Sequence, residues 1–331
     1  MADAVALQPD MKVAGIADVA ADWRIAVAMQ REFTIFAATD TAGDAMRAAG
    51  LPVTGDLSDL LAVADVVVDA TPKAIATANI AAYRSAGLNF IVQGGEKHAA
   101  TGHSFVAEAS YLAALNRQST RVVSCNTTSI VRTLTALKQA GLLLKARGVL
   151  LRRATDPWES HQGGIMNTLV PEPTIPSHQG PDAQSVDSDL DLVTMAIKVP
   201  QTLGHLHYWI VTLTRPTDRD EVLRAFCASS RILLMRDDAE LGALNTMKEW
   251  MQDIGRPRGD LYEVAVWKDM LTVQGDELFY AYMVNNQAIV VPETIDAIRA
   301  ICGLQTDPAT SIRMTDAALE IGSLQPLGGP L

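Results

Sequence analysis

Cys125 is the residue with the clearest potential for nucleophilic chemistry. Residues 120–123 end in two apolar valines and are typical of the end of a strand, and residues 129–144 carry apolar side chains at helical spacing. The thiol is therefore expected at a strand-to-helix turn, where the helix dipole lowers the pKa of a thiol and favours the nucleophilic thiolate. The alternative is a buried, inert cysteine, the usual fate of a lone free Cys.

Charged and imidazole side chains further along the chain could serve such a thiol. Arg152 and Arg153 end a predicted strand, and paired guanidinium groups can bind a phosphate bidentately; a surface ion pair is the alternative. His178 stands in a polar loop that could join this anion site. His205 and His207 alternate at a strand start, so both face one side. Without a carboxylate or cysteine pattern to complete a metal site, a general base for the thiol is the simpler interpretation for one of them, and a structural histidine is the alternative.

Other polar residues follow predicted strands in the first third of the chain. Asp18 ends a strand, and an acid at this place in a dinucleotide-binding fold binds the adenosine ribose hydroxyls; an ordinary helix cap is the alternative. Thr71 and Pro72 follow one later strand, and Gln93 and Gly94 follow another. Either pair could approach a cofactor or form a plain turn. No G-x-G-x-x-G motif precedes Asp18.

The elements that must position these residues differ between the two parts of the chain. Up to residue 124, short apolar strands alternate with helical segments, which predicts a parallel α/β sheet. After that point the strands are longer and crossover helices are fewer. This change predicts a second domain of the α+β class with a mostly antiparallel sheet.

Composition narrows the possible classes of protein. The 331 residues are 48% hydrophobic and carry a net charge of −11, which argues against nonspecific binding to nucleic acid or an anionic membrane. The three cysteines are widely spaced, which favours a reducing compartment without a disulfide framework. No signal peptide and no long apolar stretch is evident. We therefore expect a cytoplasmic protein.

Together these motifs resemble those of the archaeal-type (type II) glyceraldehyde-3-phosphate dehydrogenases. The matching runs follow the family's order over nearly the whole chain and are Gln93–Lys97, Val122–Thr128, Arg152–Arg153 with Asp156–Pro157, Pro176–His178 with Gly180–Asp182, His205–His207, Gly255–Arg256, Val266–Trp267, and Val291–Glu293 with Asp296–Arg299. Each run is a weak signal, but their order makes the joint signal strong.

The resemblance implies a role for most of the candidate residues. Cys125 would attack the aldehyde of glyceraldehyde 3-phosphate, and His205 would act as a base and as a donor to the developing oxyanion. Hydride would pass to NAD or NADP, and inorganic phosphate would release the acyl phosphate from the thioester. Arg152 would bind phosphate, with neighbouring positions around the anions at Asn126, Thr127, Arg153 and His178. The family further implies a homotetramer.

The resemblance also implies a domain arrangement. Residues 1–124 and 285–331 would form a Rossmann-like dinucleotide-binding domain, and residues 125–284 would form the catalytic domain. The family begins with a strand and a Gly-rich loop that ends in Lys-Arg-Val-Ala-Asp-Ala, whereas this chain starts Met-Ala-Asp-Ala. We expect a misassigned start, in which a GTG valine codon is read as the initiator. If the truncation is real, the sheet lacks its first, central strand and cofactor affinity is reduced.

Smaller departures from the family bear on cofactor and substrate. Asp18 and Val19 replace a Lys-Thr pair suited to the phosphate of NADP, which predicts a preference for NAD, with NADP still possible. Gln179 replaces a second histidine, and Thr294 replaces an asparagine at a nicotinamide contact. Two alternatives remain open: a dehydrogenase of another phosphorylated aldehyde such as erythrose 4-phosphate, and a catalytically impaired paralogue that serves as a binding or scaffold subunit.

Overall fold

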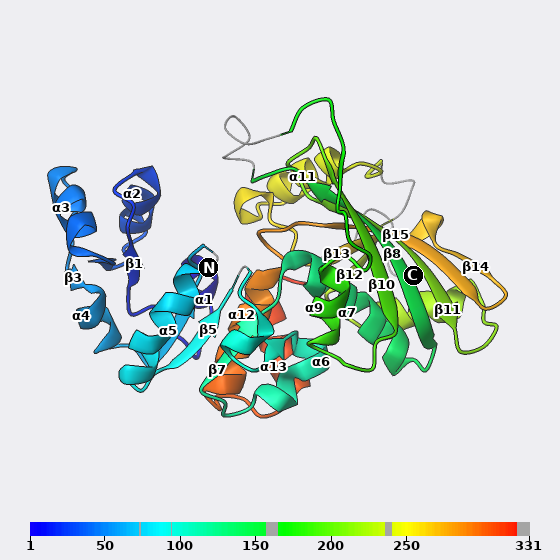
Figure 1. The fold of residues 1–331 in the computed structure, drawn as a ribbon, viewed down its shortest axis with the longest axis horizontal. Helices are drawn as coiled ribbons and strands as arrows, with labels where there is room; N and C mark the ends of the chain where they lie inside the picture. Colours follow the sequence, from blue (N-terminus) through cyan, green and yellow to red (C-terminus); the bar gives the residue numbers. More distant parts are fainter. Residues whose placement is uncertain (73, 94, 157–164, 236–239, 323–331) are drawn as a thin grey trace.

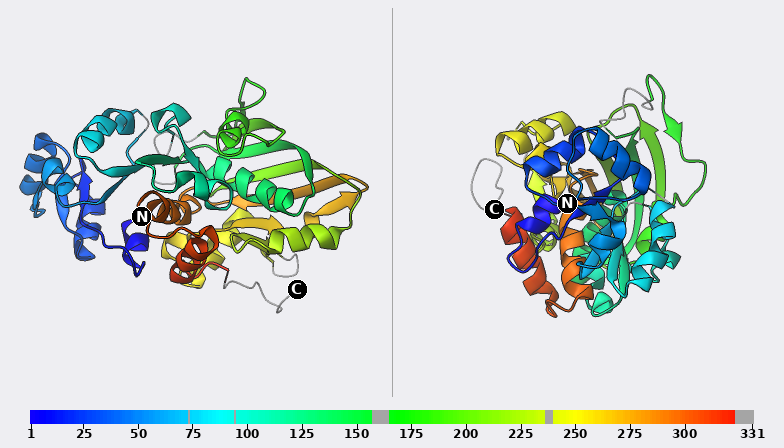
Figure 2. Two further views of the ribbon diagram at one scale, coloured as in Figure 1. Left: turned by 90° about the horizontal axis from the view of Figure 1, so that it is seen from below. Right: turned by 90° about the vertical axis from the view of Figure 1, so that its left-hand side faces the viewer.

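Three β-sheets build the chain, as seen in the computed structural model, which describes residues 1–72, 74–93, 95–156, 165–235 and 240–322. Two short parallel sheets lie towards the N-terminal end of an elongated molecule, and one large mixed sheet lies at the other end (Figure 1, Figure 2). Among the described helices, none is long and apolar enough to cross a membrane.

The first sheet is small and entirely parallel. Its order is β1-β2-β3, and Asp18, Ala37 and Asp56 share one register row at its carboxyl edge. Three of the accompanying helices begin at side-chain caps, because Asp22, Thr39 and Asp56 accept hydrogen bonds from backbone N–H groups of the following turn. The elements are α1 (Ala2–Ala6), β1 (Ile16–Asp18), α2 (Trp23–Gln30), β2 (Ile35–Ala37), α3 (Asp40–Ala48), β3 (Gly55–Asp56) and α4 (Leu57–Leu61).

The second sheet is also parallel, with the order β4-β5-β7-β6. The long helix near the C-terminus packs into its core through Ala297, Ile298 and Ile301, which meet Ile91 and Val122. The elements are β4 (Val66–Asp69), α5 (Ile75–Ser85), β5 (Asn89–Val92), η1 (His98–Ala100), β6 (Ser104–Phe105), α6 (Ala107–Ala114), β7 (Ser119–Val122), α12 (Val290–Ile301) and α13 (Pro308–Leu319).

The two parallel sheets remain separate, because β1 and β4 do not pair within the described residues. The doubly wound order would place another strand between them. The prediction of a Rossmann-like parallel-sheet region is confirmed, while the missing first strand and the domain boundaries stay predictions.

The large sheet has eight strands in the order β12-β13-β15-β11-β8-β10-β9, with β14 on β15. Only the pairs β8–β10 and β12–β13 are parallel, so the prediction of a mostly antiparallel sheet is confirmed. The strands and adjoining 3₁₀ helices are β8 (Leu143–Arg153), β9 (Val170–Pro171), β10 (Leu192–Val199), β11 (His205–Leu213), β12 (Ile232–Met235), η4 (Pro257–Gly259), β13 (Val264–Trp267), η5 (Lys268–Met270), β14 (Thr272–Gln274) and β15 (Glu277–Val284).

Helices cover the two faces of the large sheet unequally. One face buries apolar side chains against α7 (Cys125–Gln139), α9 (Gln179–Gln184) and α10 (Arg219–Cys227). On the other face, α11 (Leu244–Asp253) covers β12, β13 and β15 through Met247 and Met251. The opposite end of that face, over β8, β10 and β11, exposes apolar side chains.

A buried ion network fixes the orientation of α7 relative to α12. Arg132 on α7 is fully buried and donates to Glu293 of α12 at 2.6 Å. Arg231, at the entry to β12, donates to Glu293 at 3.1 Å and to Asp296 at 2.5 Å. Loss of one partner would leave an uncompensated buried charge, which is strongly destabilising. The network therefore ties the helix that carries Cys125 to the helix that packs on the second parallel sheet.

Candidate active site

Cys125 is the first residue of α7, and two residues link it to the end of β7. Ser124 caps the helix, because its hydroxyl accepts a hydrogen bond from the backbone N–H of Thr127 at 3.3 Å. The predicted placement at a strand-to-helix turn is therefore confirmed. Since β4, β5 and β7 are parallel, the thiol lies at the same sheet edge as the segments that follow β4 and β5.

His205, the first residue of β11, lies beside the thiol. Its Nε2 is 3.4 Å from Sγ of Cys125. Its Nδ1 accepts a hydrogen bond from the backbone N–H of Arg153 at 3.0 Å. Because a backbone N–H can only donate, the proton of the neutral imidazole must be on Nε2. The ring therefore presents an N–H donor to the sulfur.

The electrostatics of this pair differ from the expectation of an acidified thiol. Burial raises the pKa of Cys125 to about 11, and this desolvation outweighs the positive charges of Arg153 and Arg152 and the N–H groups of the helix start. The N–H groups of the helix start lower this pKa, as predicted, but the predicted net lowering is wrong for the protein without ligands because burial has the larger effect. Burial, followed by the effects of His207 and the two arginines, holds the pKa of His205 well below its usual value, so the imidazole is neutral.

The predicted anion-binding residues Arg152 and His178 share one carboxylate. Nη1 of Arg152 donates to Glu172 at 3.0 Å, and Nδ1 of His178 lies 2.8 Å from the other oxygen of Glu172. A pocket of about 190 Å³ opens beside them, and the buried Nε of Arg152 has no partner in the described part of the chain. The sequence did not single out Glu172, because nothing in its Pro-rich loop indicates where its side chain points.

The polar side chains of Arg153 and Thr127 are already paired within the protein. The Arg153 guanidinium donates to the carbonyl of Thr155 at 2.7 Å and to Asp156 at 2.6 Å. The Thr127 hydroxyl donates to Asp182 at 2.7 Å. Asp182 in turn pairs with Arg121. The sequence placed Asp182 in a matching run without assigning it a role, and it did not identify Arg121. Anion contacts by Arg153 and Thr127 stay a prediction, and they require exchange of these partners.

The amide oxygen of Asn126 contacts a histidine and does not take part in an anion site. Its Oδ1 lies 2.8 Å from Nε2 of His207, whose other ring nitrogen lies 2.9 Å from the hydroxyl of Tyr282. All three side chains are buried. Alternation along β11 predicted that His205 and His207 share a face of the sheet. In the structure they contact different residues: His205 lies against the thiol of Cys125, and His207 lies against Asn126.

The candidate cofactor residues occupy strand ends, as expected. Asp18 accepts hydrogen bonds from the backbone N–H groups of Val19 and Ala20 through Oδ1 alone, at 2.7 and 2.9 Å. Its second oxygen has no partner among the described residues, so this carboxylate suits a ribose diol. Thr71 donates both its backbone N–H and its hydroxyl to Asp69, and Pro72 is exposed beside it.

Gln93 and Thr294 meet across the boundary between β5 and α12. The amide of Gln93 donates to the hydroxyl of Thr294, which donates to the carbonyl of Val290 at 2.8 Å. Thr294 is fully buried, so its influence on a cofactor would pass through Gln93. Both remain predictions as cofactor contacts, and Gly94 lies outside the described residues.

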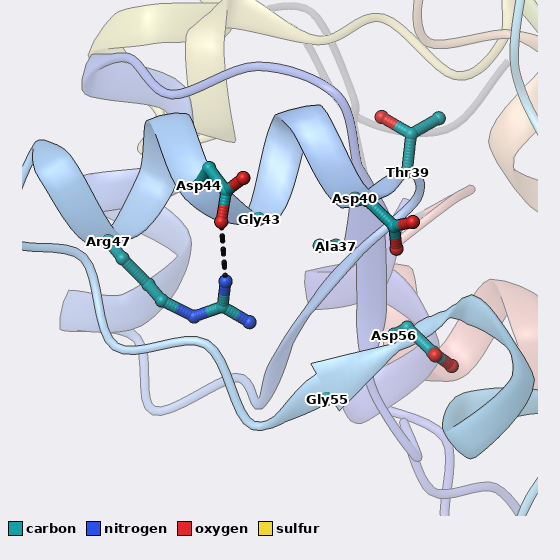
Figure 3. Close-up of a pocket in the computed structure, with 8 residues that line it drawn as sticks. All are labelled: Ala37, Thr39, Asp40, Gly43, Asp44, Arg47, Gly55 and Asp56. Carbon is teal, nitrogen blue, oxygen red and sulfur yellow. Dashed lines mark hydrogen bonds and ion pairs between the residues drawn. The ribbon is translucent and has the colours of Figure 1, made fainter.

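A second pocket, of about 250 Å³, opens at the carboxyl edge of the first sheet (Figure 3). Asp40, Asp44 and Asp56 line it together with Arg47, whose guanidinium lies 3.1 Å from Asp44. The excess of negative charge disfavours a phosphate group here. Because Asp18 shares a register row with Asp56, the whole edge is acidic.

The chain is similar to known proteins along nearly its whole length. A family model described as "Glyceraldehyde 3-phosphate dehydrogenase, C-terminal domain" matches residues 124–269. A glyceraldehyde-3-phosphate dehydrogenase of Pyrobaculum calidifontis is 44% identical over 97% of this chain and 93% of that protein. Those of Halobacterium salinarum and Methanothermobacter thermautotrophicus are 41% and 40% identical over 97% of this chain, and over 96% and 95% of their own lengths. The chain therefore belongs to the glyceraldehyde-3-phosphate dehydrogenase family, in its archaeal type.

Proposed function

We propose that this protein is a phosphorylating glyceraldehyde-3-phosphate dehydrogenase that uses a nicotinamide cofactor. The observation that carries the proposal is the 3.4 Å contact between Sγ of Cys125 and Nε2 of His205, with Arg152 close enough to lower the pKa of both groups. A nucleophile, a proton-bearing imidazole and a cation for a phosphate are the groups that this reaction needs.

In the proposed mechanism the Cys125 thiol first releases its proton to solvent. The thiolate then attacks the aldehyde carbon, and the carbon–sulfur bond forms as the carbonyl electron pair moves onto oxygen. The Nε2–H of His205 donates a hydrogen bond to this oxyanion. The cofactor, when bound, would supply the acceptor for the hydride that leaves the same carbon, and the electron pair of the oxyanion would re-form the carbonyl of a thioester. Inorganic phosphate then attacks the thioester, the carbon–sulfur bond breaks, and the thiolate of Cys125 departs. The neutral ring with its proton on Nε2 supports the donor role more than the role as a base.

We further propose that NAD is preferred to NADP. The free oxygen of Asp18 can accept hydrogen bonds from a ribose diol. Asp40 and Asp56 at the same sheet edge would repel a 2′-phosphate.

The exposed apolar face of β8, β10 and β11 supports the proposal of a homotetramer. Val149, Met195 and Tyr208 form one cross-strand row, with Ile210 two residues further along β11. These side chains are between 37% and 47% exposed. A sheet with one solvated face normally carries polar residues there, so this face suits an interface between subunits.

The test is an assay of phosphate-dependent reduction of NAD with glyceraldehyde 3-phosphate. We expect activity that requires phosphate and is abolished in Cys125→Ser, with the free energy of unfolding unchanged. A well-folded wild-type protein that lacks activity with this substrate but reduces NAD with erythrose 4-phosphate would favour the other phosphorylated aldehyde. Activity with neither aldehyde would favour a scaffold subunit.

A further inference from the structure

A second buried histidine lies next to the nucleophile without touching it. His207 is fully buried, and its two ring nitrogens both meet polar atoms: Nε2 lies 2.8 Å from Oδ1 of Asn126, and Nδ1 lies 2.9 Å from the hydroxyl of Tyr282. The rings of His207 and Tyr282 also pack together, with centroids 4.9 Å apart. Asn126 directly follows Cys125 in the first turn of α7.

The types of these atoms fix the protons of the cluster. An amide oxygen can only accept, so Nε2 of His207 must carry the ring proton. Nδ1 of the neutral ring then accepts the proton of the Tyr282 hydroxyl. Both nitrogens are used by the neutral form, and burial, assisted by the charge of Arg152, lowers the pKa of His207 to about 3. The ring therefore stays neutral across the physiological range and cannot serve as a base for the thiol.

This proton arrangement determines which end of the Asn126 amide is free to meet a ligand. With Oδ1 held by His207, the amide nitrogen is the free end of the side chain, and no described residue accepts its protons. An amide that could rotate would present either end to the site. Oxygen would repel a developing oxyanion, whereas N–H would stabilise it.

From this arrangement we infer that His207 is a positioning residue, which, with Tyr282 behind it, holds the Asn126 carboxamide so that its N–H group donates to the aldehyde oxygen during attack by Cys125. The inference rests on the proposed function. It assigns the two histidines of β11 different tasks: His205 donates to the reacting groups, and His207 fixes the direction of a second donor.

The experiment is a double-mutant cycle of Asn126→Ala with His207→Leu, read as kcat and KM for glyceraldehyde 3-phosphate. We expect Asn126→Ala to lower kcat by roughly 10²-fold, as removal of an oxyanion donor does. His207→Leu should lower kcat by at least tenfold with a smaller change in KM, and the double variant should be no slower than Asn126→Ala. His207→Gln keeps an N–H donor and should restore most of the rate.

Tyr280→Phe is the matched control, because Tyr280 lies on the same strand and its hydroxyl bonds to Thr133 at 3.2 Å instead of His207. It should retain the wild-type rate, whereas Tyr282→Phe should lower kcat severalfold. Multiplying losses in the double variant, or equal effects of the two tyrosine changes, would overturn the inference. If His207→Leu does not fold, Tyr282→Phe combined with Asn126→Ala gives the same cycle.

One further readout separates this inference from the proposed function. In ¹⁵N NMR, the Nε2–H signal of His207 should be present without substrate and should shift in Asn126→Ala. If the protein has no dehydrogenase activity but the His207 signal still responds to Asn126→Ala, the proposed function is rejected while the contact between His207 and Asn126 stands. A His207 protonated on Nδ1 alone would reject the positioning role itself.

Discussion

The Glu172 carboxylate lies 3.0 Å from Nη1 of Arg152, the cation proposed to bind the substrate phosphate. Its other oxygen lies 2.8 Å from Nδ1 of His178, so one internal anion occupies both groups of the proposed anion site. Burial raises the pKa of Glu172, but hydrogen bonds from His178 and the charge of Arg152 outweigh it, so the pKa is lowered and the carboxylate is charged at neutral pH. A substrate phosphate must therefore compete with this carboxylate.

Replacement of Glu172 by Gln removes the competing charge. We expect KM for glyceraldehyde 3-phosphate to fall about three- to fivefold, because a partly exposed ion pair contributes roughly 1 kcal/mol or less. Steady-state kinetics at fixed ionic strength measure this change. Glu221→Gln is the control, since Glu221 pairs with Arg215 in the turn before α10 and should leave KM unchanged. A rise in KM for Glu172→Gln would show that the carboxylate assists binding.

Substitution of His205 distinguishes a donor from a base. Gln at this position can donate an N–H group but cannot take a proton, whereas Leu can do neither. We expect His205→Leu to lower kcat by roughly 10²- to 10³-fold and His205→Gln to retain at least tenfold more activity than Leu. Equal losses in the two variants would instead support a base.

The raised pKa of Cys125 sets the pH dependence of its reactivity. Since the folded thiol titrates at about 11, the thiolate fraction is small at pH 7 and grows about tenfold with each pH unit up to the pKa. The rate of Cys125 alkylation in the protein without ligands should therefore rise steadily from pH 7 to pH 9. His205 and His207 are neutral over this range and should add no inflection. A plateau near pH 7 would contradict this electrostatic picture.

Asp18 is expected to set the choice of cofactor. In Asp18→Ser the repulsion of a 2′-phosphate and the acceptor for the ribose diol are both lost. The ratio of kcat/KM for NADP to that for NAD should therefore rise by about tenfold or more. Asp307→Ser serves as the control because Asp307 caps α13 and lies outside the first sheet. A wild-type preference for NADP would refute the assignment.

Tyr208 lies in the apolar row on the uncovered sheet face and tests the subunit interface. Tyr208→Lys places a charge among Val149 and Met195, so a tetramer should dissociate towards smaller species. Light scattering after size-exclusion chromatography measures the mass. Val63→Lys, at an exposed apolar position after α4 and away from the large sheet, controls for a simple gain of charge. A monomeric wild-type protein would contradict the proposed subunit interface.

Local sequence was enough to place several elements. The pattern of apolar stretches predicted longer strands in a mostly antiparallel sheet after residue 124, as observed, and the strand-to-helix turn at Cys125. These features depend on periodicity and on capping by Ser124, which are properties of neighbouring residues. The order of the motifs also placed Cys125, Arg152 and His205 in one site.

Only the tertiary structure decided what each side chain faces. Several contacts of the site join residues that are far apart in the chain. His205 meets Cys125, whereas His207 meets Asn126. Glu172 bridges Arg152 and His178, and Thr127 pairs with Asp182. The sign of the Cys125 pKa shift likewise depends on burial by distant elements, which outweighs the helix start that the sequence revealed. Desolvation and side-chain direction both arise from tertiary packing, so neither can be predicted from a local sequence pattern.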